Sequence, residues 1–324
     1  MSEAHAPARD LAPLRVVALG GGHGLAASLA ALRHVVADLT AVVTVADNGG
    51  SSGRLRREFG VLPPGDLRQA LAALCGDDDW GRTWARVLQH RFSSTGEMDE
   101  HAVGNVLIVA LWELLGGHVD GLDWVGRLLG AQGRVLPMAV TPIDITAAVR
   151  GIDARDPDSL TTVRGQIEVA GTSGQVVSVA LDPKDPPACP EALAAVAAAD
   201  WVVLGPGSWF TSVIPHLLVP ELRETLVRSP ARKVVTLNLE PQTGETDGFS
   251  PENHLEVLAD HAPDLRLDVV LADRKSVVDA GRLRATAASF GADLVIADVA
   301  AADGSPRHDS AKLADAYAGF LREA

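Results

Sequence analysis

The sequence predicts an α/β protein in which helices cover a mostly parallel β-sheet, with a small β-hairpin-rich insertion at about residues 135–181. Short apolar runs of strand length alternate with amphipathic runs of helix length. Several of these apolar runs end in loops rich in Gly, Ser, Thr and Asp. Between residues 135 and 181 this alternation stops, and short β-type runs (136–140, 161–169 and 176–181) are separated by glycines, which predicts the insertion.

Composition narrows the class of protein. The chain has 324 residues with 47% apolar side chains, enough for one large α/β domain or two smaller ones. A formal net charge of −14 argues against an extended nucleic-acid surface. No apolar run reaches the length of a membrane span, and residues 1–13 lack the apolar core of a signal peptide. We therefore expect a short disordered tail at 1–13, no membrane span and a cytoplasmic location.

The first predicted unit is a strand at residues 16–19, a glycine turn at 20–24 and a helix. Glycines let backbone N–H groups turn toward one anion, and the positive end of the helix dipole adds to that attraction. A tight turn without a ligand is the alternative. The spacing is not G-x-G-x-x-G, because Leu25 and Ser28 interrupt it, so an NAD(P)-dependent oxidoreductase is disfavoured.

The second predicted strand, 39–45, ends in the glycine–serine segment 46–53. Four arginines follow within fifteen residues: Arg54, Arg56, Arg57 and Arg68. Asp66 is expected to be the N-cap of a helix at 67–75, with Gln69 in capping-box position. Arg68 in the first turn would oppose the helix dipole, which suggests an anion nearby.

Helices are next predicted at 80–90 and 100–115. His101 and Asn105 are four residues apart at the tip of the second helix and can reach one ligand. A histidine satisfied by local hydrogen bonds is the alternative. Cys75 and Cys189 have neither disulfide nor zinc spacing.

After the insertion the α/β alternation resumes. The expected elements are a helix at 190–199, strands at 201–204, 234–239, 267–271 and 293–299, and helices that follow these strands. Pro220 is expected at N1 of one helix, and Ser250 with Pro251 as N-cap and N1 of another. The strands at 201–204 and 234–239 end in further polar loops, 205–212 and 240–248.

These strand-end loops should meet at one edge of the sheet, because parallel strands end on the same side. Micromolar binding needs about 8 kcal/mol. A helix N-terminus supplies roughly 0.3–2 kcal/mol and each charge-assisted hydrogen bond roughly 1.5–3 kcal/mol, so several loops must contribute. Asp47 is placed to accept ribose hydroxyls or to hold Mg²⁺. The chain has no Walker lysine, no G-x-S-x-G motif and no H-E-x-x-H motif. The sequence therefore indicates a binding site but no pair of nucleophile and base.

Six motifs resemble the YvcK proteins, the gluconeogenesis-factor branch of the YvcK/CofD-like superfamily. They occur in the family's order at residues 20–24 (GGGHG), 45–56 (VADNGGSSGRLR), 63–68 (PPGDLR), 101–105 (HAVGN), 205–212 (GPGS with Thr211 and Ser212) and 242–248 (QTGETDG). The likeness extends from about Leu14 to the C-terminal helix. It implies a Rossmann-like three-layer sandwich formed by a single domain, 14–324.

The resemblance also implies function. YvcK proteins are cytoplasmic bacterial proteins that bind UDP-sugars such as UDP-N-acetylglucosamine and coordinate carbon metabolism with peptidoglycan synthesis and cell shape. The CofD branch instead transfers a 2-phospho-L-lactyl group to a deazaflavin with Mg²⁺, but those transferases lack the serine-rich loop and the Pro-Pro-Gly-Asp turn. This chain departs from the family at His23, Asn48 and Glu100, where Thr, Asp and Gly are usual. The missing carboxylate at Asn48 weakens the case for a tight metal site.

We therefore expect a regulatory protein that binds a nucleotide sugar, with a phospholactate transferase as the alternative. The glycine loops and helix starts would hold the diphosphate, Arg54 or Arg68 would assist, and the loops at Ser208 and Thr246 would bound the sugar or base. Mg²⁺ and a homodimer stay open. The expected ligand-binding residues are Gly21, Gly22, His23, Gly24, Asp47, Asn48, Gly49, Gly50, Ser51, Ser52, Arg54, Asp66, Arg68, His101, Asn105, Gly205, Gly207, Ser208, Thr211, Ser212, Gln242, Glu245, Thr246 and Asp247.

Overall fold

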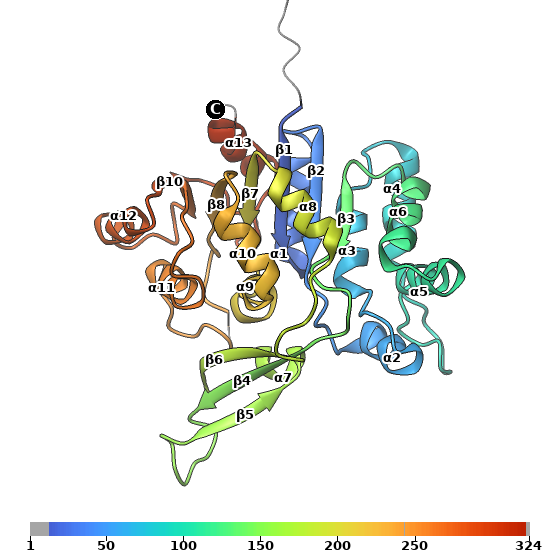
Figure 1. The fold of residues 1–324 in the computed structure, drawn as a ribbon, viewed down its shortest axis with the longest axis horizontal. Coiled ribbons are helices and arrows are strands. Elements are labelled where there is room, and N and C mark those ends of the chain that lie inside the picture. The colour runs from blue at the N-terminus through green and yellow to red at the C-terminus, as the bar shows by residue number, and fades with distance from the viewer. Residues whose placement is uncertain (1–12, 243, 322–324) are drawn as a thin grey trace, which may run out of the picture.

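The computed structural model describes residues 13–242 and 244–321, so the tail expected at 1–13 lies outside the described residues except for Pro13. A seven-stranded sheet forms the centre, and all of its strand pairs are parallel (Figure 1). Its strands, in spatial order, are β10 (Asp293–Ala297), β9 (Val269–Asp273), β8 (Arg232–Thr236), β7 (Trp201–Leu204), β1 (Arg15–Gly20), β2 (Asp38–Val43) and β3 (Arg134–Pro137). The predicted α/β fold with a mostly parallel sheet is confirmed.

Helices cover both faces of this sheet, which explains why its central strands are apolar throughout rather than alternating. The helices α1 (Gly22–Leu32), α3 (Gly65–Ala73) and α13 (Ser310–Leu321) pack together on one face, and α8 (Pro190–Ala198) and α10 (Pro220–Arg228) pack on the other (Figure 1). The segment after β7 forms η1 (Trp209–Val213, a π-helical turn), which contacts β1, and α9 (Pro215–Leu218), which contacts β6. The helices α11 (Pro251–His261) and α12 (Ala280–Ser289) pack together, and α12 packs on β10. A cluster beside β3 contains α2 (Gly50–Phe59), α4 (Asp79–Gln89), α5 (Val103–Leu115) and α6 (His118–Leu129).

A second, three-stranded antiparallel sheet projects below the carboxyl edge of the large one (Figure 1). It consists of β5 (Leu160–Arg164), β4 (Asp144–Arg150) and β6 (Gln175–Asp182), with the short helix α7 (Gln166–Ala170) between β5 and β6. The small β-rich sheet was predicted, but its extent was not. The strand predicted at 136–140 is β3 and pairs with β2 in the large sheet, and residues 166–170 are helical rather than extended.

Helix boundaries differ from the sequence analysis at three functionally relevant places. The prediction of Asp66 as an N-cap is wrong: α3 (Gly65–Ala73) begins two residues earlier than predicted, its N-cap is Pro64, and Asp66 lies in the first turn. His101 precedes α5 rather than lying on it. The glycine–serine segment was predicted to be a loop, since Gly and Ser are typical of loops. Its residues Gly-Ser-Ser-Gly instead form the first turn of a helix, α2. No helix in the described part of the chain is long and apolar enough to cross a membrane.

Candidate functional site

The turn after β1 and the turn after β7 are in direct backbone contact at the carboxyl edge of the sheet. The strand order reverses between these two neighbours, the point where open α/β sheets form ligand crevices. A Cβ atom on Gly24 would overlap the carbonyl of Pro206 and fall 2.5 Å from Gly207 Cα, so only glycine permits this approach. Two turns about 180 residues apart in the sequence therefore form one surface.

This surface lines a cavity of about 430 Å³, which we call the ligand cavity. Its wall comes from four segments: the first turn of α1, the segment after β7, the segment after β8, and α7 of the small sheet. The lining residues are Gly21, Gly22, His23, Gly24, Gln166, Ile167, Ala170, Gly207, Ser208, Thr211, Ser212, Gln242 and Glu245. The structure thus brings together most of the residues expected from the first, third and fourth polar loops.

The start of α1 is suited to an anion. Its N-cap, Gly21, has no side chain that could accept from the first-turn N–H groups, and the backbone N–H of Gly22 faces the buried Asp66 carboxylate. The start of the helix still presents the positive end of its dipole and its other N–H donors. His23 and Gly24 belong to this first turn, and both line the ligand cavity.

Glu245 connects two walls of the ligand cavity. Its carboxylate accepts hydrogen bonds from Ser208 Oγ and from the backbone N–H of Phe210, the latter at 2.7 Å. The side chain is buried, and burial raises the pKa of Glu245. Thr246 and Asp247, two further predicted ligand residues, lie outside this lining and shape the turn: Thr246 Oγ1 accepts from Gln242 N at 2.8 Å, and Asp247 Oδ2 accepts from Gly244 N at 2.9 Å.

A second cavity, of about 520 Å³, adjoins the first. The two share His23, Gly24, Gly207 and Gln242, and the second adds residues that the sequence analysis did not include in the site: Ala27, Pro206, Asn238, Leu239, Glu240, Pro241, Pro306, Arg307 and His308. Asn238 holds the neighbouring turn by accepting from Gly207 N and donating to Gly207 O, both at 2.9 Å. Its position at the end of the predicted strand 234–239 was the available signal. Burial lowers the pKa of His308 to about 4, so this imidazole is neutral at pH 7.

A separate buried cluster forms around Ser51 at the start of α2. Ser51 Oγ accepts from the backbone N–H of Ala102 at 3.2 Å and from Asn105 Nδ2 at 3.1 Å, so its own proton is directed to His101 Nδ1, 3.1 Å away. Burial, and next the charge of Arg54, lowers the pKa of His101. Ser51 is only 1% exposed and its hydrogen-bonding capacity is used, so this contact joins α2 to α5 and does not present a nucleophile.

Asp66 connects this cluster with the ligand cavity. A Cβ atom on Gly21 would fall 2.6 Å from Asp66 Oδ2, and one on Gly65 would fall 2.7 Å from Asp47 Oδ2. Burial, and next the charge of Asp47, raises the pKa of Asp66 to about 7. Asp66 Oδ2 is buried without a hydrogen-bond partner among the described residues. Arg68 is also buried, donates to Asn105 Oδ1 at 2.9 Å, and has its pKa lowered to about 10, chiefly by burial.

The chain and its fold match known proteins. A family model described as 2-phospho-L-lactate transferase CofD matches residues 16–306. The chain belongs to the CofD family. A protein named "Putative gluconeogenesis factor" from Mycobacterium tuberculosis is 52% identical over 302 residues, covering 92% of this chain and 88% of the relative. The "Gluconeogenesis factor" of Bacillus subtilis is 34% identical over 265 residues, covering 82% and 80%.

The fold of this CofD-family chain also matches a solved structure. A crystal structure of a UPF0052-family protein from Bacillus halodurans superposes with a TM-score of 0.82 at 31% identity. The match covers 94% of this chain and 99% of the other. Both sheets therefore belong to an architecture shared with its relatives.

Several expected site residues of this CofD-family protein lie outside the lining of the ligand cavity. Arg54 donates to the carbonyls of Glu97 (3.2 Å) and Asp99 (2.5 Å), and Ser52 Oγ accepts from Gly65 N at 3.0 Å. The Asp66 carboxylate lies against Gly21, which lines the cavity. Asp47 is not in the lining, but its charge raises the pKa of the neighbouring Asp66. The remaining residues outside the lining are Asn48, Gly49, Gly50, Ser51, Arg68, His101, Asn105, Gly205, Thr246 and Asp247.

Asn48 connects α2 to α7. Its Nδ2 donates to Glu168 Oε2 at 2.7 Å, and its Oδ1 accepts from the backbone N–H of Ile167 at 3.2 Å. Only an amide can make both bonds. The amide at this position thus matches the local structure, and Asn48 holds α7, which forms one wall of the ligand cavity.

Replacing Asn48 by aspartate should therefore loosen α7. The new carboxylate would face Glu168, with loss of one hydrogen bond and like-charge repulsion, and we expect a destabilisation of about 1–2 kcal/mol. Urea unfolding measures the loss, and N48D combined with Glu168→Gln should recover most of it. An unchanged unfolding midpoint for N48D would contradict this role.

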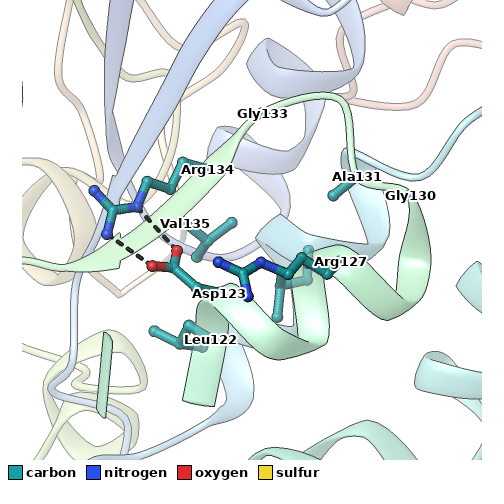
Figure 2. Close-up of a pocket in the computed structure, with 10 residues that line it drawn as sticks. Leu122, Asp123, Arg127, Gly130, Ala131, Gly133, Arg134 and Val135 are labelled. Carbon is teal, nitrogen blue, oxygen red and sulfur yellow. Dashed lines mark hydrogen bonds and ion pairs between the residues drawn. The ribbon is translucent and has the colours of Figure 1, made fainter. Parts of the chain in front are cut away.

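Figure 2 shows a cavity at the opposite end of the sheet, of about 370 Å³ between α6 and the start of β3. Asp123 and Arg134 close one side of it through hydrogen bonds of 2.9 and 2.8 Å (Figure 2). Because this cavity lies at the amino end of β3, it is no part of the site at the carboxyl edge.

Proposed function

We propose that this protein is a regulatory protein that binds a nucleotide sugar of the UDP-N-acetylglucosamine type at the carboxyl edge of its sheet. The observation that carries the proposal is the convergence of three polar strand-end segments and α7 on a cavity that opens at the start of α1, whose N-cap is a glycine. Backbone N–H groups and hydroxyls suit a diphosphate and sugar hydroxyls.

The two adjoining cavities suggest how such a ligand would lie. The diphosphate would rest against the first turn of α1, with Ser208 and Thr211 facing the sugar side. The adjoining cavity, which Asn238 and Arg307 help to line, would take the nucleoside. Their volumes, about 430 and 520 Å³, fall within the roughly 300–1,000 Å³ typical of small-molecule sites.

Mg²⁺ would fit only together with the diphosphate. Among the described residues, no group of three or more His, Cys, Asp or Glu side chains gathers as a metal site. Asp47 and Asp66 bring two carboxylates close together, and Mg²⁺ is commonly held by one or two carboxylates plus ligand phosphates. The unpartnered Asp66 Oδ2 supports this assignment.

We propose that this protein is a gluconeogenesis factor, as its relatives are named. Proteins named gluconeogenesis factor cover most of this chain at 33–52% identity. A cytoplasmic protein that senses a UDP-sugar would link carbon metabolism with cell-wall synthesis and cell shape, because UDP-N-acetylglucosamine is a product of the first and a substrate of the second.

Calorimetric titration with UDP-N-acetylglucosamine tests the proposal. We expect one site with a micromolar dissociation constant. Gln242 lies at the junction of both cavities, and its Oε1 is buried without a partner in the described part of the chain, so Gln242→Ala should weaken binding roughly fivefold, the equivalent of about 1 kcal/mol. Gln89→Ala, at an exposed position on α4, is the control and should bind like the wild type. No heat at millimolar ligand would contradict the proposal.

The alternative is phospholactyl transfer, which the description of the matching family model favours. The assay contains the guanylylated phospholactate donor, a deazaflavin acceptor and Mg²⁺. Product formation well above that of a no-enzyme control would replace the regulatory proposal by the enzymatic one. We expect none, because Ser51 and His101 are committed to structural hydrogen bonds.

A further inference from the structure

Arg56 and Arg57, which follow the glycine–serine segment, line a fourth cavity, of about 300 Å³, between α2 and the small sheet. We call it the arginine pocket. Its lining residues are Asn48, Gly53, Arg56, Arg57, Asp144, Arg164 and Gly165. None of them lines the ligand cavity, and α7 lies between the two.

The arginine pocket has an excess of positive charge in a strongly acidic chain. Three arginines and one carboxylate, that of Asp144, line the pocket, whereas the whole chain has a net charge of −14. The Glu168 carboxylate lies next to this lining, hydrogen-bonded to Asn48. Asp144 holds two of the arginines side by side: Arg56 Nη2 lies 2.7 Å from Oδ1, and Arg164 Nη2 lies 2.7 Å from Oδ2. Arg164 also pairs with Asp182 at 2.5 Å.

The guanidinium groups of Arg56 and Arg57 have N–H donors that are available to a ligand. Arg56 Nη1 is buried and has no hydrogen-bond partner in residues 13–242 and 244–321. Arg57 forms no ion pair within the same residues, and its Nη1 lies 3.3 Å from the position of a Cβ on Gly53. A Cβ on Gly53 would overlap the backbone carbonyl of Asn48, so this position has no room for a side chain. Arg56 and Arg57, on successive positions of α2, both line the arginine pocket.

We infer that the arginine pocket binds a small phosphate monoester. Guanidinium groups present planar N–H donors that match tetrahedral oxyanions, and an unpaired buried donor such as Arg56 Nη1 gains a partner when an oxyanion enters. Arg57 adds a second cation at the rim. At about 300 Å³ the arginine pocket is smaller than either cavity of the proposed nucleotide-sugar site, which favours a phosphate on a compact carbon skeleton. This site is independent of the proposed nucleotide-sugar site.

The test titrates the full chain with inorganic phosphate and, separately, with glucose 6-phosphate, following thermal unfolding and calorimetric heat against sodium chloride at equal ionic strength. We expect saturable binding, and the tighter of the two probes distinguishes free phosphate from a phosphorylated metabolite. Arg56→Gln and Arg57→Gln should each weaken binding at least tenfold. The charge-matched control, Arg228→Gln on the exposed face of α10, should bind normally.

Arg57→Gln keeps the test decisive, because Arg57 is exposed and its loss breaks no ion pair that the described residues form. This variant should lose phosphate binding while retaining the heat of the UDP-N-acetylglucosamine titration, whose outcome decides the proposed function separately. Absence of saturable binding by both phosphate probes in the wild type would overturn the inference. So would undiminished binding in both arginine variants, or a joint loss of phosphate and nucleotide-sugar binding in Arg57→Gln.

Discussion

Replacing Gly24 by alanine is expected to abolish nucleotide-sugar binding and to lower the free energy of unfolding by about 3 kcal/mol. The added Cβ would overlap the carbonyl of Pro206 and approach Gly207 Cα to 2.5 Å. Both neighbours are backbone atoms, which cannot rotate aside as a side chain can. The turn after β7 would have to move away from α1, and the ligand cavity would open between its two principal walls.

Gly126→Ala is the matched control for this prediction. Gly126 lies in α6, and the nearest atom to its Cβ position is Ala131 Cβ at 4.0 Å. Alanine in a helix is about 0.5–1 kcal/mol more favourable than glycine, so this variant should be as stable as the wild type or slightly more so. Urea denaturation and calorimetry measure both variants. If Gly24→Ala bound and unfolded like the wild type, the close approach of the two turns would be refuted, and the location of the proposed site with it.

The sequence predicted the layered architecture because each unit carries its own local signal. The strand at 201–204 was predicted with its observed bounds, and Pro220 and Ser250 with Pro251 occupy the predicted helix-start positions. Capping and proline rules act within a few residues, so sequence alone reveals them. The same holds for the glycine turn at α1, whose role depends on missing side chains.

What the sequence did not reveal depends on contacts between distant segments. The prediction of extended structure at 161–169 failed from residue 166 onward, where α7 begins and Asn48, more than a hundred residues away, accepts the N–H of Ile167 in its first turn. Asp66 was predicted to be a helix N-cap, but its carboxylate lies against Gly21 in the glycine turn. Arg307 and Asn238 line a cavity beside His23 only because β8 and the segment after β10 end at the same edge as β1.

The second large effect is on pH dependence, through Asp66. Burial, and next the charge of Asp47, raises the pKa of Asp66 to about 7 in the folded chain, against an ordinary value of 3.8. Between these two values the folded state holds a proton that the unfolded state has lost. The free energy of unfolding therefore falls as pH rises from about 4 to about 7, by about 4 kcal/mol from this group, and is unaffected by it above that range.

Asp66→Asn should remove this dependence, because the amide stays neutral as the protonated acid does. The variant should match the wild type near pH 4 and exceed its unfolding free energy by up to about 4 kcal/mol at about pH 8. The difference between the two urea-unfolding curves across this range isolates Asp66 from other carboxylates. Asp264→Asn, at an exposed position before β9, should show no such difference. A pH-independent difference for Asp66→Asn would refute the raised pKa.

The same measurement tests how the carboxylate pair relates to a ligand. A cation beside Asp47 and Asp66 favours their ionised forms, so Mg²⁺ added with UDP-N-acetylglucosamine should reduce the pH dependence of the wild type. The ligand without Mg²⁺ should have the opposite effect, because a diphosphate next to Gly21 adds negative charge near Asp66 and raises its pKa further. The backbone of Gly21 lies directly against the Asp66 carboxylate. If neither the ligand alone nor the ligand with Mg²⁺ changed the pH dependence of the unfolding free energy, the ligand would have to bind away from Gly21.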